Sequence, residues 1–355
     1  MPSELQLATA FALSLVAALV LVPVAMRIAV RTDFVDVPGG YKGHARTTPY
    51  LGGLAVVSAV AIALFVTGAA TSRFAALFVW AFVLFVVGTI DDKRSLNPLP
   101  RLLIEIVAAA ALWNYGLGWT VFDSDILNIA LTVIWVVGLV NAFNLMDNMD
   151  GAASTVAGVS ATGVAALGIL YNDMALAIIG VSLAGACLGF LRYNLAKPSR
   201  IFLGDGGSMP IGFVIAGAVM ASPGAADFGW SALLALAPMV GLPILDTTLV
   251  VISRRRGGRP VLSGGRDHLT HRLRAMFGGS ARAVVLALAA LQGTLCLSAV
   301  ALSQVGMAFA IGATMIFAAA GGYAIFVLET PGRGRLATVS RTLPAESAAP
   351  ENSAA

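Results

Sequence analysis

The chain has 355 residues, of which 58% are hydrophobic and 11% are charged, and its formal net charge is +4. An average soluble domain has about 25% charged residues, and a single globular core stops growing near this chain length. The composition therefore excludes a soluble enzyme, a disordered chain and a nucleic-acid-binding module, and it indicates a polytopic membrane protein. Cys187 and Cys296 both lie in apolar runs, so no disulfide framework is expected.

Eleven apolar stretches recur along the chain, each close to the roughly 20 residues that a helix needs to cross a membrane. They cover 5–27, 50–69, 74–90, 102–118, 124–142, 152–171, 174–191, 208–222, 230–251, 281–303 and 306–328. The fourth and eighth are the weakest, because Asn114 and Gly116 interrupt the fourth and the eighth is short. The runs are continuous, so we expect an all-α membrane domain over 1–330 and no β-barrel. Residues 331–355 are rich in Ala, Ser, Pro and Glu, which predicts a disordered cytoplasmic tail.

The basic residues predict the orientation of these spans. If the N-terminus lies outside the cell, Arg73 is the one basic residue in an outside connection, and the other 21 of the 22 Lys and Arg lie in or beside inside connections. Cytoplasmic loops carry an excess of Lys and Arg. We therefore expect the N-terminus outside, the C-terminus inside and the plasma (inner) membrane as the location.

Once the spans are oriented, acidic residues gather at the predicted inside ends. Asp91 and Asp92 directly follow the third span, where two carboxylates can bind a divalent cation or act as a base toward a phosphate. The alternative is a solvated helix end in which Lys93 and Arg94 are their partners.

A second motif, NAFNLMDNMDG, places two amides and two carboxylates at intervals of three residues, so that they form one polar stripe on a helix or tight turn. The four are Asn141, Asn144, Asp147 and Asp150. Hard oxygen ligands of this kind suit Mg²⁺, which binds a few protein oxygens together with substrate phosphates. The alternative is a capping cluster at Asp150 and Gly151, but two Asn and two Asp exceed what a cap requires.

Three further segments add candidate groups. Glycines flank Asp205 in FLGDGGSMPIGF and provide backbone N–H groups that can approach phosphate oxygens. The basic segment 254–274 carries Arg254, His268 and His271, which suit the phosphates and sugar of a nucleotide donor, although lipid headgroups are an alternative partner for its charge. Lys42 and His44 precede the second span and are weaker candidates, and the role of Asp246, inside the ninth span, is left open.

Taken in order, the segments VDVP…KGH, DD, N-x-x-N-x-x-D-x-x-DG, F-x-GD-x-GS and DH-x-x-HR resemble the polyprenyl-phosphate N-acetylhexosamine-1-phosphate transferase family. The resemblance implies transfer of a sugar-1-phosphate, preferably GlcNAc-1-phosphate, from a UDP-sugar to a polyprenyl phosphate such as undecaprenyl phosphate. UMP is released, and Mg²⁺ is required, with Mn²⁺ as an alternative ion. The expected setting is the start of a cell-envelope polysaccharide.

The resemblance also implies roles for individual residues. Asn144 and Asp205 would be metal ligands, and Asp91 or Asp92 would activate the polyprenyl phosphate, while Asp147 and Asp150 would shape the nucleotide and metal pocket. Substrate-binding roles fall to Lys42, His44, Arg101, Asn141, Asn194, Arg254, His268 and His271. The chain departs from the family pattern at Asn148, where Gly is usual, at Thr270, where His is usual, and at Arg101, where Lys is usual.

Three alternatives remain open at this stage. The chain can instead be a phospho-N-acetylmuramoyl-pentapeptide transferase, which differs in its donor. It can be an ion-coupled transporter or lipid flippase, but such proteins place ionisable groups near the membrane midplane. A catalytically inactive scaffold is disfavoured by the complete set of acidic residues. Whether the protein forms a homodimer is open as well.

Overall fold

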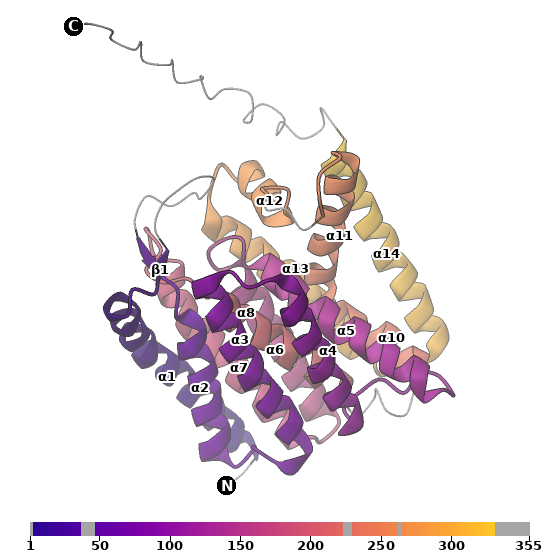
Figure 1. Ribbon diagram of the computed structural model, residues 1–355. Coiled ribbons are helices and arrows are strands. Elements are labelled where there is room, and N and C mark those ends of the chain that lie inside the picture. The colour runs from indigo at the N-terminus through magenta and orange to yellow at the C-terminus, as the bar shows by residue number, and fades with distance from the viewer. Residues whose placement is uncertain (1–2, 37–46, 223–228, 262–264, 331–355) are drawn as a thin grey trace, which may run out of the picture.

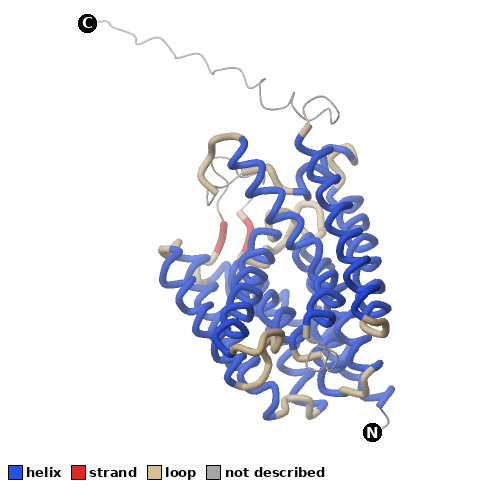
Figure 2. The backbone as a smooth tube through the Cα atoms, turned by 90° about the vertical axis from the view of Figure 1, so that its right-hand side faces the viewer, coloured by secondary structure: helices blue, strands red, loops and turns tan. Residues whose placement is uncertain are grey.

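The computed structural model describes residues 3–36, 47–222, 229–261 and 265–330. Long helices run roughly along one direction, and a pair of short strands lies near one end of the bundle (Figure 1; Figure 2). The helices are α1 (Ser3–Arg31), α2 (Gly52–Thr67), α3 (Ala75–Arg94), α4 (Pro98–Asn114), α5 (Asp125–Met146), α6 (Ala152–Leu170), α7 (Met174–Asn194), α8 (Asp205–Met220), α10 (Trp230–Leu236), α11 (Gly241–Arg256), α12 (Leu269–Met276), α13 (Ala281–Leu302) and α14 (Met307–Glu329), with short 3-10 helices η1 (Ser72–Phe74) and η2 (Ala237–Val240).

Each of the eleven expected apolar segments falls on a helix, which confirms the all-α class. The ninth is broken: α10 ends at Leu236, η2 contains Pro238, and α11 begins at Gly241, just before Pro243. Proline lacks the N–H that an α-helix needs, which explains the break. Among the described residues, eight helical segments are long and apolar enough to cross a membrane, and α2 and α8 are shorter apolar helices. The count of eleven spans and their orientation stay predictions.

The helices differ in how deeply they are buried. Side chains of α6, α7 and α8 are mostly buried and form the centre of the bundle. In contrast, α14 has only Ala310 and Ile325 buried. Large apolar side chains also cover the outer faces, as Phe65 and Leu297 do. A protein that is apolar both inside and outside is suited to a lipid environment.

A small antiparallel sheet closes one end of the bundle. Strand β1 (Val35–Asp36) pairs with β2 (Thr48–Pro49). Strand β2 and the start of α2 bond to the segment that leads into α8: Phe202 N–H donates to Pro49 O (2.8 Å), and Gly53 N–H donates to Leu203 O (2.9 Å). Lys42 and His44 belong to the connection between the two strands and lie outside the described residues, so their predicted substrate contacts stay predictions.

Glycine 88 lets α3 approach the first turn of α8. A Cβ atom at Gly88 would lie 2.4 Å from the carbonyl oxygen of Asp205 and 2.7 Å from the amide nitrogen of Gly206. Both neighbours are backbone atoms, so a side chain at this position forces the two helices apart. The site described below depends on this close approach.

We expect Gly88→Ala to destabilise the protein by about 1–3 kcal/mol through overpacking and to displace Asp205. Gly138 in α5 provides the matched control, because a Cβ there meets nothing within 4 Å. Gly138→Ala should be neutral or slightly stabilising. Thermal unfolding of both variants in detergent measures the difference, and equal midpoints would contradict the close packing at Gly88.

Candidate active site

The predicted chemical groups meet at one end of the bundle. Asp91 and Asp92 lie in the last turn of α3, Asn141 and Asn144 near the end of α5, and Asp205 at the start of α8. This is the end that carries β1 and α12 in Figure 1. The segments that carry Asp91, Asn144 and Asp205 therefore converge as expected. The basic segment joins them, because Thr270 of α12 bonds to Asn148.

Arg101, near the start of α4, connects three of these elements. Its Nη1 donates to Asp91 Oδ2 (2.7 Å) and to Asp205 Oδ2 (3.4 Å), and its Nη2 donates to Asn141 Oδ1 (3.4 Å). One turn later, Glu105 Oε1 lies 3.6 Å from Arg101 Nε. A guanidinium provides five donors in a planar fork, so it can hold several carboxylates that would otherwise repel one another.

Asp92 positions the first turn of α8. Its Oδ1 accepts a hydrogen bond from Asp205 N–H (2.8 Å), and its Oδ2 accepts one from Gly206 N–H (3.0 Å). The first N–H groups of a helix have no partner within the helix, and a carboxylate there is stabilised by the helix dipole. Asp92 therefore fixes the backbone that presents Asp205.

The amides of α5 face the same acids. Asn144 Nδ2 donates to Asp205 Oδ1 (2.6 Å) and to Ser208 Oγ (3.2 Å). Asn141 Nδ2 donates to Glu105 Oε2 and to Val137 O. The expected metal pair, Asn144 and Asp205, is thus in direct contact.

The turn after α5 adds further negative charge. Burial and the neighbouring carboxylates of Asp205, Asp92 and Asp150 raise the pKa of Asp147 well above its usual range, although the Gly204 backbone amide opposes this shift. Carboxylates that raise each other's pKa are close together and incompletely neutralised. Asp147 and Asp150 therefore belong to the same acidic cluster as Asp205.

Asn194, expected to bind substrate, bonds to two backbone segments. Its Oδ1 accepts from Gly151 N–H (2.6 Å), its Nδ2 donates to Ile201 O (2.8 Å), and its side chain is buried. Gly151 has a φ of +79°, a conformation that favours glycine. Asn194 thus ties the turn containing Asp150 to the segment that leads to Asp205.

Arg254 is held by an acidic residue of the α11–α12 connection. Its Nε donates to Asp267 Oδ2 (2.9 Å), and its Nη1 donates to Val261 O (2.6 Å). Burial alone would raise the pKa of Asp267, but the hydrogen bond from Arg254 and the charges of Arg254 and Arg259 outweigh it and lower that pKa. Arg254 and Asp267 therefore form a buried ion pair that fixes the basic segment.

The histidines stand at the start of α12. Asp246, fully buried in α11, uses both oxygens there: Oδ2 lies 2.9 Å from His268 Nδ1, and Oδ1 accepts from Leu269 N–H (2.6 Å). The role of Asp246 that the sequence left open is thus to orient His268 and to cap α12. Burial, together with His268, Arg266 and Arg274, lowers the pKa of His271 to about 4, so this imidazole is neutral at pH 7.

Two departures from the family pattern contact each other. Thr270 Oγ1 donates to Asn148 Oδ1, while Asn148 Nδ2 donates to Leu145 O (2.7 Å). Thr270 is fully buried. This hydrogen bond joins the acidic turn after α5 to α12.

We expect Asn148 and Thr270 to be energetically coupled. Asn148→Ala and Thr270→Val should each lower the free energy of unfolding, and the double variant should lose less than the sum of the two effects. The coupling energy expected for one buried hydrogen bond is about 1 kcal/mol. Strictly additive effects would show that the contact does not link the two segments.

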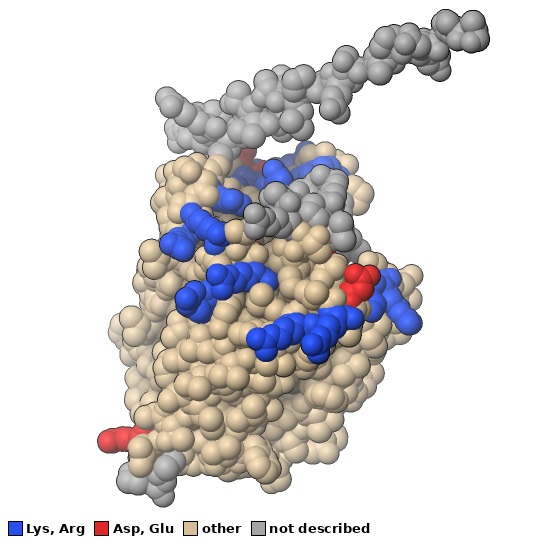
Figure 3. All heavy atoms as spheres, turned by 90° about the vertical axis from the view of Figure 1, so that its left-hand side faces the viewer, with Lys and Arg blue, Asp and Glu red and all other residues tan. Residues whose placement is uncertain are grey.

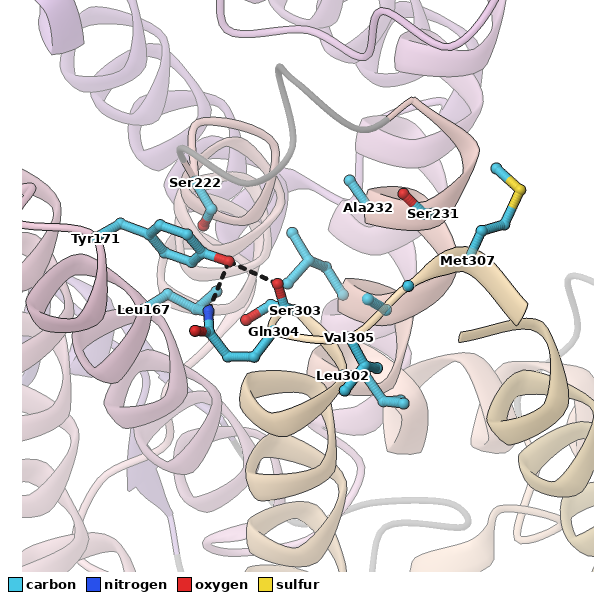
Figure 4. Close-up of a pocket in the computed structure, with 13 residues that line it drawn as sticks. Leu167, Tyr171, Ser222, Ser231, Ala232, Leu302, Ser303, Gln304, Val305 and Met307 are labelled. Atoms are coloured by element: carbon cyan, nitrogen blue, oxygen red, sulfur yellow. Dashed lines mark hydrogen bonds between the residues drawn. The ribbon is translucent and has the colours of Figure 1, made fainter. Parts of the chain in front are cut away.

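A separate cavity of about 280 Å³ lies among the ends of α6, α8, α10 and α13 (Figure 4). Tyr171 Oη donates to Ser303 O and accepts from Gln304 Nε2. Among the described residues that line the cavity there is no Asp, Glu, His, Lys or Arg. The described part of this cavity therefore offers no charged side chain to a phosphate.

Sequence reasoning did not assign roles to Glu105 and Asp267. Glu105 is buried beside Arg101 and Asn141, and its position four residues after Arg101 was the signal in the sequence. Asp267 lies in the DH-x-x-H motif, which was its signal in the sequence. Its ion pair with Arg254, 13 residues earlier, is seen only in the structure.

Comparison with known proteins identifies the family. The profile of glycosyl transferase family 4 matches residues 74–222. The chain is 30% identical to the probable undecaprenyl-phosphate N-acetylglucosaminyl 1-phosphate transferase of Bacillus subtilis, over 84% of this chain and 86% of that protein. The chain belongs to glycosyl transferase family 4.

Other proteins similar to this chain differ in the acceptor or donor that their names give. The decaprenyl-phosphate N-acetylglucosaminephosphotransferase of Mycobacterium tuberculosis is 34% identical over 74% of each chain. The phospho-N-acetylmuramoyl-pentapeptide-transferase of Clostridium beijerinckii is 30% identical over 50% of this chain and 61% of its own length. Family 4 membership makes this protein a multi-pass membrane enzyme, and it supports the transferase interpretation and not the transporter alternative.

Proposed function

We propose that this protein transfers GlcNAc-1-phosphate from UDP-GlcNAc to a polyprenyl phosphate and releases UMP, on the cytosolic side of the plasma membrane. The observation that carries the proposal is the convergence of Asp91, Arg101, Asn144 and Asp205 from four helices. Relatives named for this transfer match most of the chain.

The acidic cluster fits a divalent cation. Arg101 bonds to Asp91 and Asp205, and burial, together with the neighbouring carboxylates, raises the pKa of Asp147 well above its usual range. A bound divalent cation would favour the ionised form of these acids. Within the described residues, no three acidic, His or Cys side chains surround one point. Mg²⁺ is commonly held by one or two protein carboxylates together with substrate phosphates, so Asp205 with Asn144 is the proposed ligand pair.

In the proposed reaction, an oxygen of the polyprenyl phosphate attacks the sugar-bound phosphorus of UDP-GlcNAc. A new P–O bond forms, the bond from that phosphorus to the bridging oxygen breaks, and its electron pair leaves with UMP. When bound, Mg²⁺ would neutralise part of the charge on the phosphates. Arg101 provides fixed positive charge in the same place.

The two carboxylates of α3 take different parts in this proposal. Both oxygens of Asp92 accept backbone N–H groups of α8, so Asp92 positions Asp205. Asp91 Oδ1 accepts a hydrogen bond from Leu96 N–H, and its Oδ2 accepts one from Arg101, which also bonds to Asp205. We assign Asp91 to the acceptor phosphate because it shares this arginine with Asp205. His268, oriented by Asp246, and neutral His271 would contact the donor.

A donor panel tests the proposed function. Purified protein in detergent, with Mg²⁺ and undecaprenyl phosphate, should form a lipid product of the mass expected for GlcNAc-1-phosphate addition and should release UMP. UDP-GalNAc and UDP-muramoyl-pentapeptide are the competing donors. A lipid product from the pentapeptide donor alone would overturn the choice of sugar, and substrate uptake into vesicles without UMP would overturn the transferase.

A further inference from the structure

A second groove, on the flank of the bundle, combines apolar walls with positive charge. It has a volume of about 460 Å³ and lies between the second half of α1 and the end of α7. Pro23, Met26 and Val30 of α1 and Tyr193 of α7 form its apolar part. None of these residues takes part in the site at the ends of α3, α5 and α8.

An irregularity in α1 shapes this groove. In an α-helix the N–H of Pro23 would bond to the carbonyl of Leu19, but proline has no N–H. The hydroxyl of Tyr193 donates to Leu19 O instead (2.9 Å), and the carbonyl of Tyr193 accepts a hydrogen bond from Arg200 N–H (3.3 Å). One tyrosine therefore fixes α1 against α7 and also places Arg200 at the rim.

Three arginines surround the groove. Arg27 and Arg31 stand one turn apart on α1, Arg200 follows α7, and all three are exposed. In the part of the chain that the structure describes, no carboxylate pairs with any of the three side chains. Like charges four residues apart on a helix repel each other. An anion bound in the groove would reduce the repulsion between Arg27 and Arg31.

The position of the charges relates them to a membrane surface. Figure 3 shows Lys and Arg side chains across the upper half of this flank and a surface with few charged residues below them. Arg27 and Arg31 belong to the last turns of the long apolar helix α1. Basic pockets at the ends of membrane helices recognise anionic lipid headgroups, and guanidinium groups bind phosphate oxygens through paired N–H donors.

We propose that this groove binds an anionic glycerophospholipid, with its phosphate among Arg27, Arg31 and Arg200 and an acyl chain along Pro23, Met26 and Val30. The apolar wall favours a lipid over free phosphate. The acidic residues and Arg101 of the proposed active site belong to α3, α4 and α8, whereas α1 and the end of α7 line the groove. This separation favours a structural lipid over the polyprenyl phosphate that takes part in the reaction. The inference is independent of the proposed function, because lipid retention is measured without turnover.

The test is native mass spectrometry of the full-length protein in detergent with added phosphatidylglycerol or phosphatidylcholine of the same acyl chains. The variant R27Q/R31Q/R200Q removes the three groove charges, and R255Q/R256Q/R282Q removes three exposed charges on α11 and α13. Each basic group near a surface contributes on the order of fivefold in binding, so the groove variant should retain phosphatidylglycerol at least about tenfold less well. The control variant should change by less than about twofold, and R27K/R31K/R200K should keep most of the binding.

Several results would overturn this assignment. Equal losses in the two Gln variants would mean general surface attraction, and equal retention of the two phospholipids by the unchanged protein would mean that no anion site exists. Preferred retention of undecaprenyl phosphate would identify the groove as a carrier site. Displacement of phosphatidylglycerol by millimolar inorganic phosphate would reduce it to a simple anion site. Monodisperse elution and an unchanged unfolding midpoint confirm that the variants are folded.

Discussion

Asp205→Asn is expected to lower UMP release by about 10²–10³-fold or more, because the substitution removes a carboxylate on which the proposed site depends. Asp205 is held by Asn144 Nδ2, Arg101 Nη1 and, through its own N–H, Asp92. Asn has nearly the same shape as Asp, so the fold should be retained. The readout is kcat for UMP release at saturating UDP-GlcNAc and undecaprenyl phosphate.

Asp125→Asn provides the matched control. Asp125 is an exposed acid in the first turn of α5, at the far end of the helix from Asn141 and Asn144. The Asp125→Asn variant should release UMP at the rate of the unchanged protein. Full UMP release by Asp205→Asn, with normal folding, would remove Asp205 from the site.

Arg101→Ala is expected to cost about 10²-fold in UMP release, because the guanidinium neutralises Asp91, Asp205 and Glu105 together. Arg101→Lys keeps the charge without the planar fork and should retain activity within about tenfold. The contrast between the two variants separates the contribution of charge from that of geometry.

Arg94→Ala is the control for Arg101→Ala. Arg94 is exposed in the last turn of α3, a few residues from Asp91. Its substitution tests whether the loss of any positive charge near Asp91 is sufficient to lower UMP release. A loss as large as that of Arg101→Ala would contradict the specific role of Arg101. A loss of less than about twofold would support it.

The sequence predicts the helices well, because apolar runs of about 20 residues leave few alternatives to membrane helices. It does not predict the break in the ninth segment, which divides around Pro238 into α10, η2 and α11, whereas α1 and α8 continue through Pro23 and Pro210. It also does not reveal that a side chain at Gly88 would collide with the backbone of Asp205, since that contact joins residues 117 positions apart (205 minus 88).

For the site, spacing and helix ends predicted that Asp91, Asn144 and Asp205 meet, and the structure brings them together. Spacing does not distinguish a residue that faces substrate from one that positions a neighbour. Asp92 and Asn194 carry polar groups typical of a site, yet both bond mainly to backbone amides and carbonyls. Such partners depend on tertiary folding and leave no local signal.

Direct binding of a divalent cation tests the central claim most sharply. Electron paramagnetic resonance counts free Mn²⁺ during titration of purified protein with UDP-GlcNAc present, for the unchanged protein and for Asp205→Asn. We expect saturable binding that Mg²⁺ displaces and that Asp205→Asn weakens by at least about tenfold. Identical Mn²⁺ binding by the two proteins would contradict the account.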